Sequence, residues 1–329
     1  MVAVAAAPFL GCGHRAQPHR PLTAPLDPAP PIAAPACPPD AAPSRRYAVP
    51  STALSERAAR AALAAHFAPH QIAGHLAHHS AEDVWQYGVR HDASGRLAQY
   101  KPREELANAQ LTCQFVIPSD DVWPAALADL GANCPLGLWV RGHEQLPELT
   151  AHAVAVTGNR AATAQALTRT QAFAAAVAEA GHTVTATLAY GVDSTAHRAA
   201  ARAGLATLAV LPRGLDHAHP HDHAQLLSSI PASGGTVVSL FRPGAPASGA
   251  TLRASAALLA ALVRAVVLVE ALDHAEAAMH TAEVAADLNR PVLVPPPTDE
   301  MRADGSLRLL AEQRAVLVPD PAHALAALR

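Results

Sequence analysis

Short apolar runs and longer amphipathic segments alternate along the second half of the chain. The runs have the length of strands and are rich in Val, Leu and Ala, and the segments between them repeat apolar positions at helical spacing. The predicted strands are 153–157, 183–188, 207–211, 236–240, 265–270 and 291–294. The predicted helices between them lie near 163–180, 193–203, 221–229, 253–263 and 275–287. This alternation predicts a Rossmann-like, doubly wound α/β fold with a mainly parallel sheet, helices on both faces and a ligand site at the carboxyl ends of the strands.

The same fold is expected to begin before its first Rossmann strand. Residues 114–117 and 137–140 are predicted strands on either side of a helix that starts near Trp123. After residue 305 the pattern adds one helix and a short strand. The α/β domain is therefore assigned to residues 106–329.

Two further parts are predicted upstream of this domain. Residues 51–105 carry apolar positions at helical spacing from Ser55 onward, and are assigned to a small helical domain of the SAM or helix-hairpin-helix type. Residues 1–50 are rich in Pro and Ala and have no apolar periodicity. Such a composition cannot bury enough surface to offset chain entropy, so it predicts a disordered tail.

Composition and charge narrow the classes of partner. The 329 residues are 50% hydrophobic and carry a net charge of −3, so any binding of nucleic acid must depend on a local arginine patch. No uncharged apolar run is long enough for a convincing membrane span, and no membrane contact is expected. The four cysteines form no C-x-x-C pair, which fits a reducing compartment and predicts a cytoplasmic protein.

The turn after the first Rossmann strand, Gly158-Asn159-Arg160, is a candidate anion site. A glycine lets the backbone come close to a ligand, and the helix that starts near Thr163 directs free N–H groups and its positive dipole end to the same place. The Arg160 guanidinium is suited to phosphate. The turn therefore predicts a phosphate-bearing ligand, and the alternative is a tight turn with a solvent-facing arginine.

A second candidate follows the next strand, at Tyr190-Gly191-Val192-Asp193. We expect Asp193 to cap the following helix and also to line the pocket. His197, one turn later on the same face, is interpreted as a structural histidine. Tyr190 offers a ring on which a base could stack.

Metal and catalytic sites are not assigned. The run 216–223 carries four histidines, a metal-ligand type, but Pro220 opens a helix and splits the set. No Ser-His-Asp arrangement, carboxylate pair or Walker loop has a convincing context. We therefore expect neither a metal nor another cofactor, and no enzymatic activity.

Over roughly residues 55–320 these segments resemble the DprA/Smf family of bacterial DNA-processing proteins. The family's Gly-Ser-Arg is similar to Gly158-Asn159-Arg160, and its Ser-Gly-x-Ala-x-Gly-Ile-Asp is similar to residues 186–193. Its Val-Leu-Gly-x-Gly-Leu-Asp is similar to 210–216, and its entry to the domain resembles Trp123-Pro124 followed by 138–142.

The departures from the family pattern predict a divergent member with a thinned strand-binding surface. The family's Arg-Asn-Arg aligns with Ser255-Ala256-Ala257, where Arg253 lies two residues upstream as a substitute. The family's Ser-Gly-Ser-Leu-x-Thr loop after the fifth strand corresponds to residues 275–281, of which only Thr281 matches the family pattern. We expect arginines restored at Ser255 and Ala257 to reach solvent, because these positions flank the start of the predicted helix.

The resemblance implies binding of single-stranded DNA, protection of incoming DNA and loading of the RecA recombinase in natural transformation, by a homodimer. The residues assigned to DNA or phosphate are Gly158, Asn159, Arg160, Tyr190, Gly191, Asp193, Arg213, Gly214, Arg242, Arg253 and Thr281. The main alternative is a nucleotide-binding or nucleotide-cleaving sensor on the same fold. A third is a degenerate paralogue that only assembles with partners.

Overall fold

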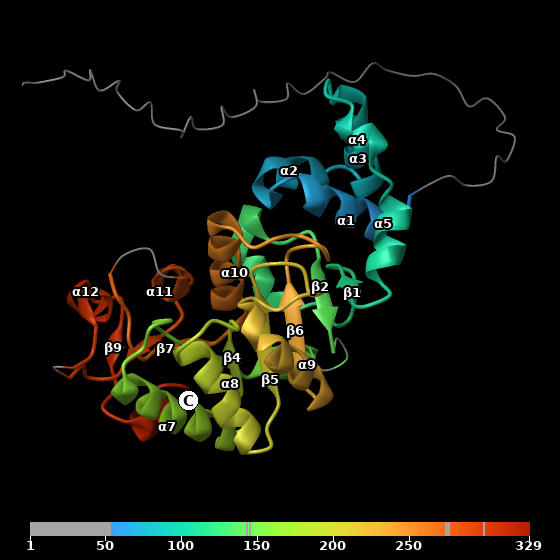
Figure 1. Ribbon diagram of the computed structural model, residues 1–329. Coiled ribbons are helices and arrows are strands. Elements are labelled where there is room, and N and C mark those ends of the chain that lie inside the picture. The colour runs from blue at the N-terminus through green and yellow to red at the C-terminus, as the bar shows by residue number, and fades with distance from the viewer. Residues whose placement is uncertain (1–53, 143, 145, 274–276, 299) are drawn as a thin grey trace, which may run out of the picture. The chain divides into compact units, whose positions relative to one another are not determined.

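A single sheet, built from apolar strands, organises the chain in the computed structural model (Figure 1). The structure describes residues 54–142, 144, 146–273, 277–298 and 300–329, so the predicted tail lies outside the described residues. Within these ranges the sheet has nine strands: β1 Gln114–Val116, β2 Leu138–Arg141, β3 Ala153–Thr157, β4 Thr183–Ala186, β5 Thr207–Leu211, β6 Thr236–Ser239, β7 Ala265–Leu268, β8 Val292–Val294 and β9 Val316–Leu317.

The strand order is β1-β2-β6-β5-β4-β3-β7-β8-β9. β2 is antiparallel to both β1 and β6, and the remaining neighbours are parallel. The Rossmann-like, mainly parallel α/β fold expected from the sequence is thereby confirmed.

Helices cover both faces of the sheet. The side chains of each buried strand alternate between the faces, so both faces carry apolar side chains that helices bury. Ala153 and Ala155 of β3 belong to the apolar cluster that contains α10 and α11, whereas Val154 and Val156 belong to the cluster of α7 and α8. The helices of this part are α6 Leu146–Ala151, α7 Ala164–Glu179, α8 Val192–Arg202, α9 Ala224–Ala232, α10 Gly249–Leu262, α11 Ala277–Asp287, α12 Asp304–Ala311 and α13 Pro321–Ala326, with the 3₁₀ segments η1 Ala125–Asn133 and η3 His221–His223.

The upstream segment is helical, as its pattern predicts. It contains α1 Glu56–His66, α2 Pro69–Leu76, α3 Ala81–His91, α4 Arg96–Gln99 and α5 Pro102–Ala109. Ser55 caps α1 by accepting the Ala58 N–H. Ala58 of α1 and Leu106 of α5 share a buried cluster with Trp139 of the sheet, so these helices pack directly on the edge formed by β1 and β2.

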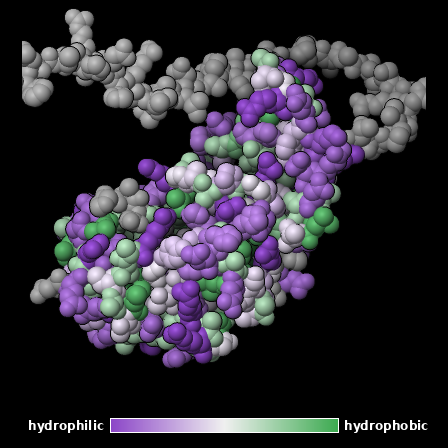
Figure 2. Space-filling model, in the orientation of Figure 1, coloured by the Kyte–Doolittle hydropathy of each residue, from purple (hydrophilic) through white to green (hydrophobic). Residues whose placement is uncertain are grey.

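Polar and apolar side chains are interspersed over the face shown in Figure 2. Among the described residues, no helix combines the length and the apolar character that crossing a bilayer requires.

The strand order changes direction at β3, and this determines where a ligand can enter. The chain passes from β3 to β4, β5 and β6 on one side, and then returns to place β7 on the other side of β3. Loops that leave β3 and β7 therefore diverge at the carboxyl edge of the sheet. Such a topological switch point is the usual ligand crevice of an open α/β sheet.

Candidate functional site

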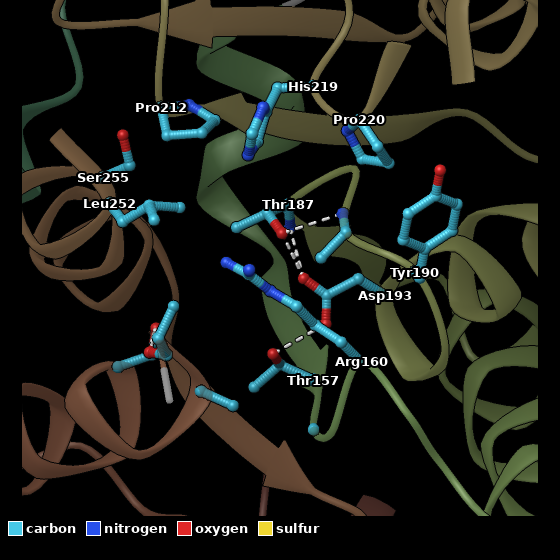
Figure 3. Close-up of a pocket in the computed structure, with 15 residues that line it drawn as sticks. Thr157, Arg160, Thr187, Tyr190, Asp193, Pro212, His219, Pro220, Leu252 and Ser255 are labelled. Atoms are coloured by element: carbon cyan, nitrogen blue, oxygen red, sulfur yellow. Dashed lines mark hydrogen bonds between the residues drawn. The ribbon is translucent and has the colours of Figure 1, made fainter. Parts of the chain in front are cut away.

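A pocket of about 160 Å³ opens at this switch point (Figure 3). Its floor is made by the carboxyl ends of β3, β4 and β5, and helices α10 and α11 form one wall. The residues that line it are Thr157, Gly158, Arg160, Thr187, Ala189, Tyr190, Asp193, Pro212, His219, Pro220, Leu252, Ser255, Ala277, Ala278 and Thr281. Five of the residues assigned from the sequence therefore line one pocket: Gly158, Arg160, Tyr190, Asp193 and Thr281.

In the turn after β3, Gly158 and Asn159 have structural roles, and Arg160 is left available to a ligand. A Cβ on Gly158 would lie 2.7 Å from the Glu270 carbonyl oxygen, so only glycine fits this close approach. Asn159 is buried; its Nδ2 donates to Glu270 Oε1 at 3.1 Å and its Oδ1 accepts the Leu272 N–H at 3.0 Å. Its side chain thus holds the turn instead of facing the pocket. Arg160 is exposed, extends into the pocket, and forms no ion pair within the described ranges (Figure 3).

Glu270, which sequence reasoning did not single out, holds this turn from the end of β7. It is 0% exposed, and its Oε2 accepts both the N–H and the hydroxyl of Thr163 at 3.0 Å, while Oε1 accepts the Arg302 N–H at 3.1 Å. Thr163 is the N-cap of α7, so the start of this helix is as predicted. However, the Glu270 carboxylate lies at the start of α7, where the sequence suggested an external anion. The available signal was a lone acidic residue directly after an apolar strand.

Asp193 has a different role from the helix cap that the sequence suggested. Gly191, with φ 74°, is the N-cap of α8, and Asp193 lies inside the helix. Its buried carboxylate accepts the Thr157 hydroxyl at 2.8 Å, the Thr187 N–H at 3.1 Å and the Thr187 hydroxyl (Figure 3). Burial raises its pKa to about 6, although these hydrogen bonds oppose the shift. The carboxylate therefore ties the ends of β3 and β4 together at the pocket floor.

His197 is a structural residue, as expected. Its Nε2–H donates to the Thr187 carbonyl oxygen at 3.1 Å, and its Nδ1 accepts the Thr207 hydroxyl at 2.9 Å. Burial lowers its pKa to about 4, so the ring is neutral at physiological pH.

Two arginines lie at the pocket: Arg160 lines it, and Arg213 directly follows the lining residue Pro212. Burial lowers the pKa of His219, which also lines the pocket, and the positive charges of Arg160 and Arg213 lower it further. Arg213 is half-buried; its Nε is fully buried without a hydrogen-bond partner, and the side chain has no ion pair among the described residues. Two uncompensated arginines beside one cavity favour an anionic ligand.

Tyr190 provides an aromatic wall. Tyr190 is 43% exposed, its hydroxyl donates to Asp222 at 2.7 Å, and its ring lies 4.9 Å from that of His223 in a T-shaped arrangement. These two contacts hold the ring of Tyr190 next to the pocket.

Arg242 and Gly214 do not line this pocket, and Thr281 lines it with its hydroxyl bonded to its own helix. Arg242 is not at this pocket; it lies 3.7 Å from Glu105 of α5. Gly214 packs against the Arg242 carbonyl oxygen, which leaves no space for a Cβ, so its role is in loop packing. Thr281 lines the pocket, but its hydroxyl donates to the Ala277 carbonyl oxygen at 3.0 Å.

Ser255 corrects the expectation about restored arginines. α10 begins at Gly249, so Ser255 lies inside the helix, 1% exposed, and its hydroxyl donates to the Leu211 carbonyl oxygen at 3.0 Å. An arginine here would have to displace this contact and fill the pocket instead of reaching solvent.

The histidine run divides among several partners. His217 lies 3.5 Å from Asp216, His219 lines the pocket, and His223 Nδ1–H donates to the Leu188 carbonyl oxygen at 2.6 Å. Across the described ranges no three His, Cys, Asp or Glu residues are grouped so that they could hold a metal ion.

The fold and the site define an α/β protein with a small, arginine-flanked pocket at a topological switch point. Residues 114–329 match the family model of DNA recombination-mediator protein A, and the chain belongs to this family. It is 37% identical over 208 residues to a DprA-type DNA processing protein of Mycobacterium tuberculosis, an alignment that covers 60% of this chain and 53% of the relative. It is 32% identical over 213 residues to protein Smf of Escherichia coli, covering 64% and 55%.

Solved structures show the same fold. The chain is similar to DNA processing protein A from Streptococcus pneumoniae, with a TM-score of 0.65 and 26% identity over 74% of this chain and 85% of that one. It is also similar to DNA processing protein A from Helicobacter pylori, a structure described for its single-stranded DNA binding mode, with a TM-score of 0.57 and 23% identity over 65% and 95%. The chain spans about half the length of the curated relatives it matches.

Proposed function

We propose that the chain binds single-stranded DNA at the pocket and acts as a DNA-processing protein by binding, without covalent chemistry. The observation that carries the proposal is geometric: Arg160 lines the pocket, Arg213 directly follows the lining residue Pro212, and neither has an ion-pair partner among the described residues. Membership of the DNA recombination-mediator protein A family supports it.

The geometry suggests how each part contributes. Arg160, Arg213 and the exposed Arg253 of α10 would contact backbone phosphates, which fix position without reading sequence. Tyr190 would stack on a base. Asp193 and Glu270 would hold the loops that carry Arg160, so the cation is positioned before the strand arrives.

At the level of the cell, the proposal extends to protection of incoming DNA, loading of RecA in natural transformation, a homodimeric state and a cytoplasmic location. These follow from resemblance to the family. A nucleotide-cleaving sensor is less favoured, because a cavity of about 160 Å³ is smaller than the roughly 300–1,000 Å³ of sites that enclose a small molecule.

The test is fluorescence anisotropy with a labelled oligothymidylate at low salt. Arg160→Ala should weaken binding by roughly tenfold or more, the loss for hydrogen bonds to a charged group. Arg202→Ala removes the same charge from the exposed end of α8, at the opposite edge of the sheet, and should leave binding unchanged. Equal effects of the two substitutions would contradict a site at the pocket.

A further inference from the structure

A second cavity, of about 150 Å³, lies where the helical segment meets the sheet. Tyr100 precedes α5, Glu105 belongs to α5, Trp139 lies on β2, and Arg242 and Pro243 follow β6; all five line it. A cavity of this volume has room for about one six-membered ring. No residue of the first pocket lines this cavity.

Both cavities are lined by residues that follow the carboxyl ends of neighbouring strands: Pro212 after β5 in the first, and Arg242 and Pro243 after β6 in the second. Arg213 follows the carboxyl end of β5, and Arg242 follows the carboxyl end of the neighbouring strand β6. Their loops are joined directly: the Gly214 N–H donates to the Ala245 carbonyl oxygen at 3.0 Å, and the Gly244 N–H donates to Asp216 Oδ1 at 3.0 Å. The loop that carries Arg213, next to the first pocket, is therefore in direct contact with the loop that carries Arg242, at the second cavity.

The Arg242 guanidinium is available to a ligand. Its contact with Glu105 is 3.7 Å long, beyond hydrogen-bond distance, and both side chains are nearly half exposed. An exposed pair of this kind contributes little to stability. A phosphate that offered charge-assisted hydrogen bonds would replace it readily.

Aromatic side chains give the cavity its chemistry. Tyr100 is held by ring contacts with His66 at 4.7 Å and with Trp85 at 5.7 Å, and Trp139 packs against Phe115 at 4.7 Å. Tyr100 is half-buried and so keeps part of its ring accessible, whereas Trp139 is 3% exposed and forms the buried wall of the cavity. A fixed, accessible ring with a cation nearby is the combination that binds bases of single-stranded nucleic acid without strict sequence preference.

We propose that this cavity is a second nucleobase subsite for the same single strand, with Arg242 on the adjoining phosphate. The inference rests on the proposed function, because the strand would enter it from the first pocket. It gives the helical segment a direct part in binding, since Ala61 of α1, Tyr100 and residues of α5 line the cavity.

The experiment compares oligothymidylates of about 4 and about 16 nucleotides, the range of single-strand site sizes. In the full chain, Arg242→Ala should leave affinity for the short oligonucleotide unchanged and weaken the long one by about tenfold. Glu105→Gln removes the competing carboxylate and should tighten the long one only. Arg202→Ala, at the opposite edge of the sheet, should change neither.

The outcomes separate this inference from the proposed function. If Arg242→Ala weakens both lengths equally, or neither, the second subsite is wrong. If Arg160→Ala leaves the short oligonucleotide bound as tightly as before, the proposed function fails, whatever Arg242 does. Thermal unfolding of each variant confirms that the comparison is made on folded protein.

Discussion

Two buried carboxylates, Asp193 and Glu270, fix the loops around the pocket. Neither has a cationic partner within hydrogen-bond distance among the described residues; hydroxyl and backbone N–H donors satisfy them instead. A buried charge is tolerated only when its hydrogen bonds are complete. The backbone that presents Arg160 is thus held from both sides, by Asp193 at Thr157 and by Glu270 at Asn159.

Glu270→Gln should therefore be costly although it preserves shape. The glutamine side chain has an NH₂ group in place of one carboxylate oxygen. This NH₂ group is itself a donor and would face the N–H of Thr163 or of Arg302, which now donates to the carboxylate. Leaving such donors unsatisfied costs about 2 kcal/mol or more of unfolding free energy, measured by urea denaturation. Glu179→Gln, on the exposed end of α7, should stay within roughly 0.5 kcal/mol. An unchanged free energy of unfolding in Glu270→Gln would mean that the turn does not depend on this carboxylate.

Asp193 predicts a pH dependence of stability. Its pKa is about 6 in the folded state against 3.8 when exposed, so the folded state binds the proton more tightly. The stabilisation that this tighter proton binding gives the folded state is fully present below pH 3.8 and is lost as pH rises through 6. From pH 7.5 to 5, the wild type should gain roughly 1 kcal/mol relative to Asp193→Asn in urea denaturation. The pKa of His197, about 4, acts in the opposite direction, but it acts in both proteins and cancels. A constant difference across this range would contradict the assignment.

At the scale of elements, the turn between β4 and α8 depends on backbone contact. A Cβ at Gly191 would collide with the carbonyl oxygens of Asn159 and Arg160, whereas Gly204, with a similar φ of 72° against 74°, has open space around it. Gly204→Ala should cost about 1–2 kcal/mol for the left-handed conformation alone. Gly191→Ala should cost clearly more, and equal melting temperatures of the two variants would show that the close approach is not required.

The parallel strands and their helices could be predicted because each apolar run is buried on both faces and carries its own signal, as Val154 and Val156 show. The hydrogen-bond partners could not be predicted, since Thr157 and Asp193 are 36 residues apart and Asn159 and Glu270 are 111 apart. Local rules suggested a cap at Asp193. The tertiary arrangement of the strand ends determined its role instead.

At the scale of the whole molecule, the net charge of −3 means that long-range attraction to nucleic acid is weak. Binding has to come from arginines gathered at one edge of the sheet, and Arg160 and Arg213 are the two beside the pocket. The fold gathers them because both follow carboxyl ends of parallel strands, β3 and β5.

The most direct test of this account is the salt dependence of oligothymidylate binding by the wild type and by Arg160→Ala/Arg213→Ala. Each phosphate contact on a single strand contributes about 0.7 to the slope of log affinity against log salt. The account predicts that the double variant loses up to about 1.4 of this slope and most of its affinity at low salt, with an unchanged melting temperature. An unchanged slope in a folded double variant would contradict the central claim that the pocket binds the strand through these two arginines.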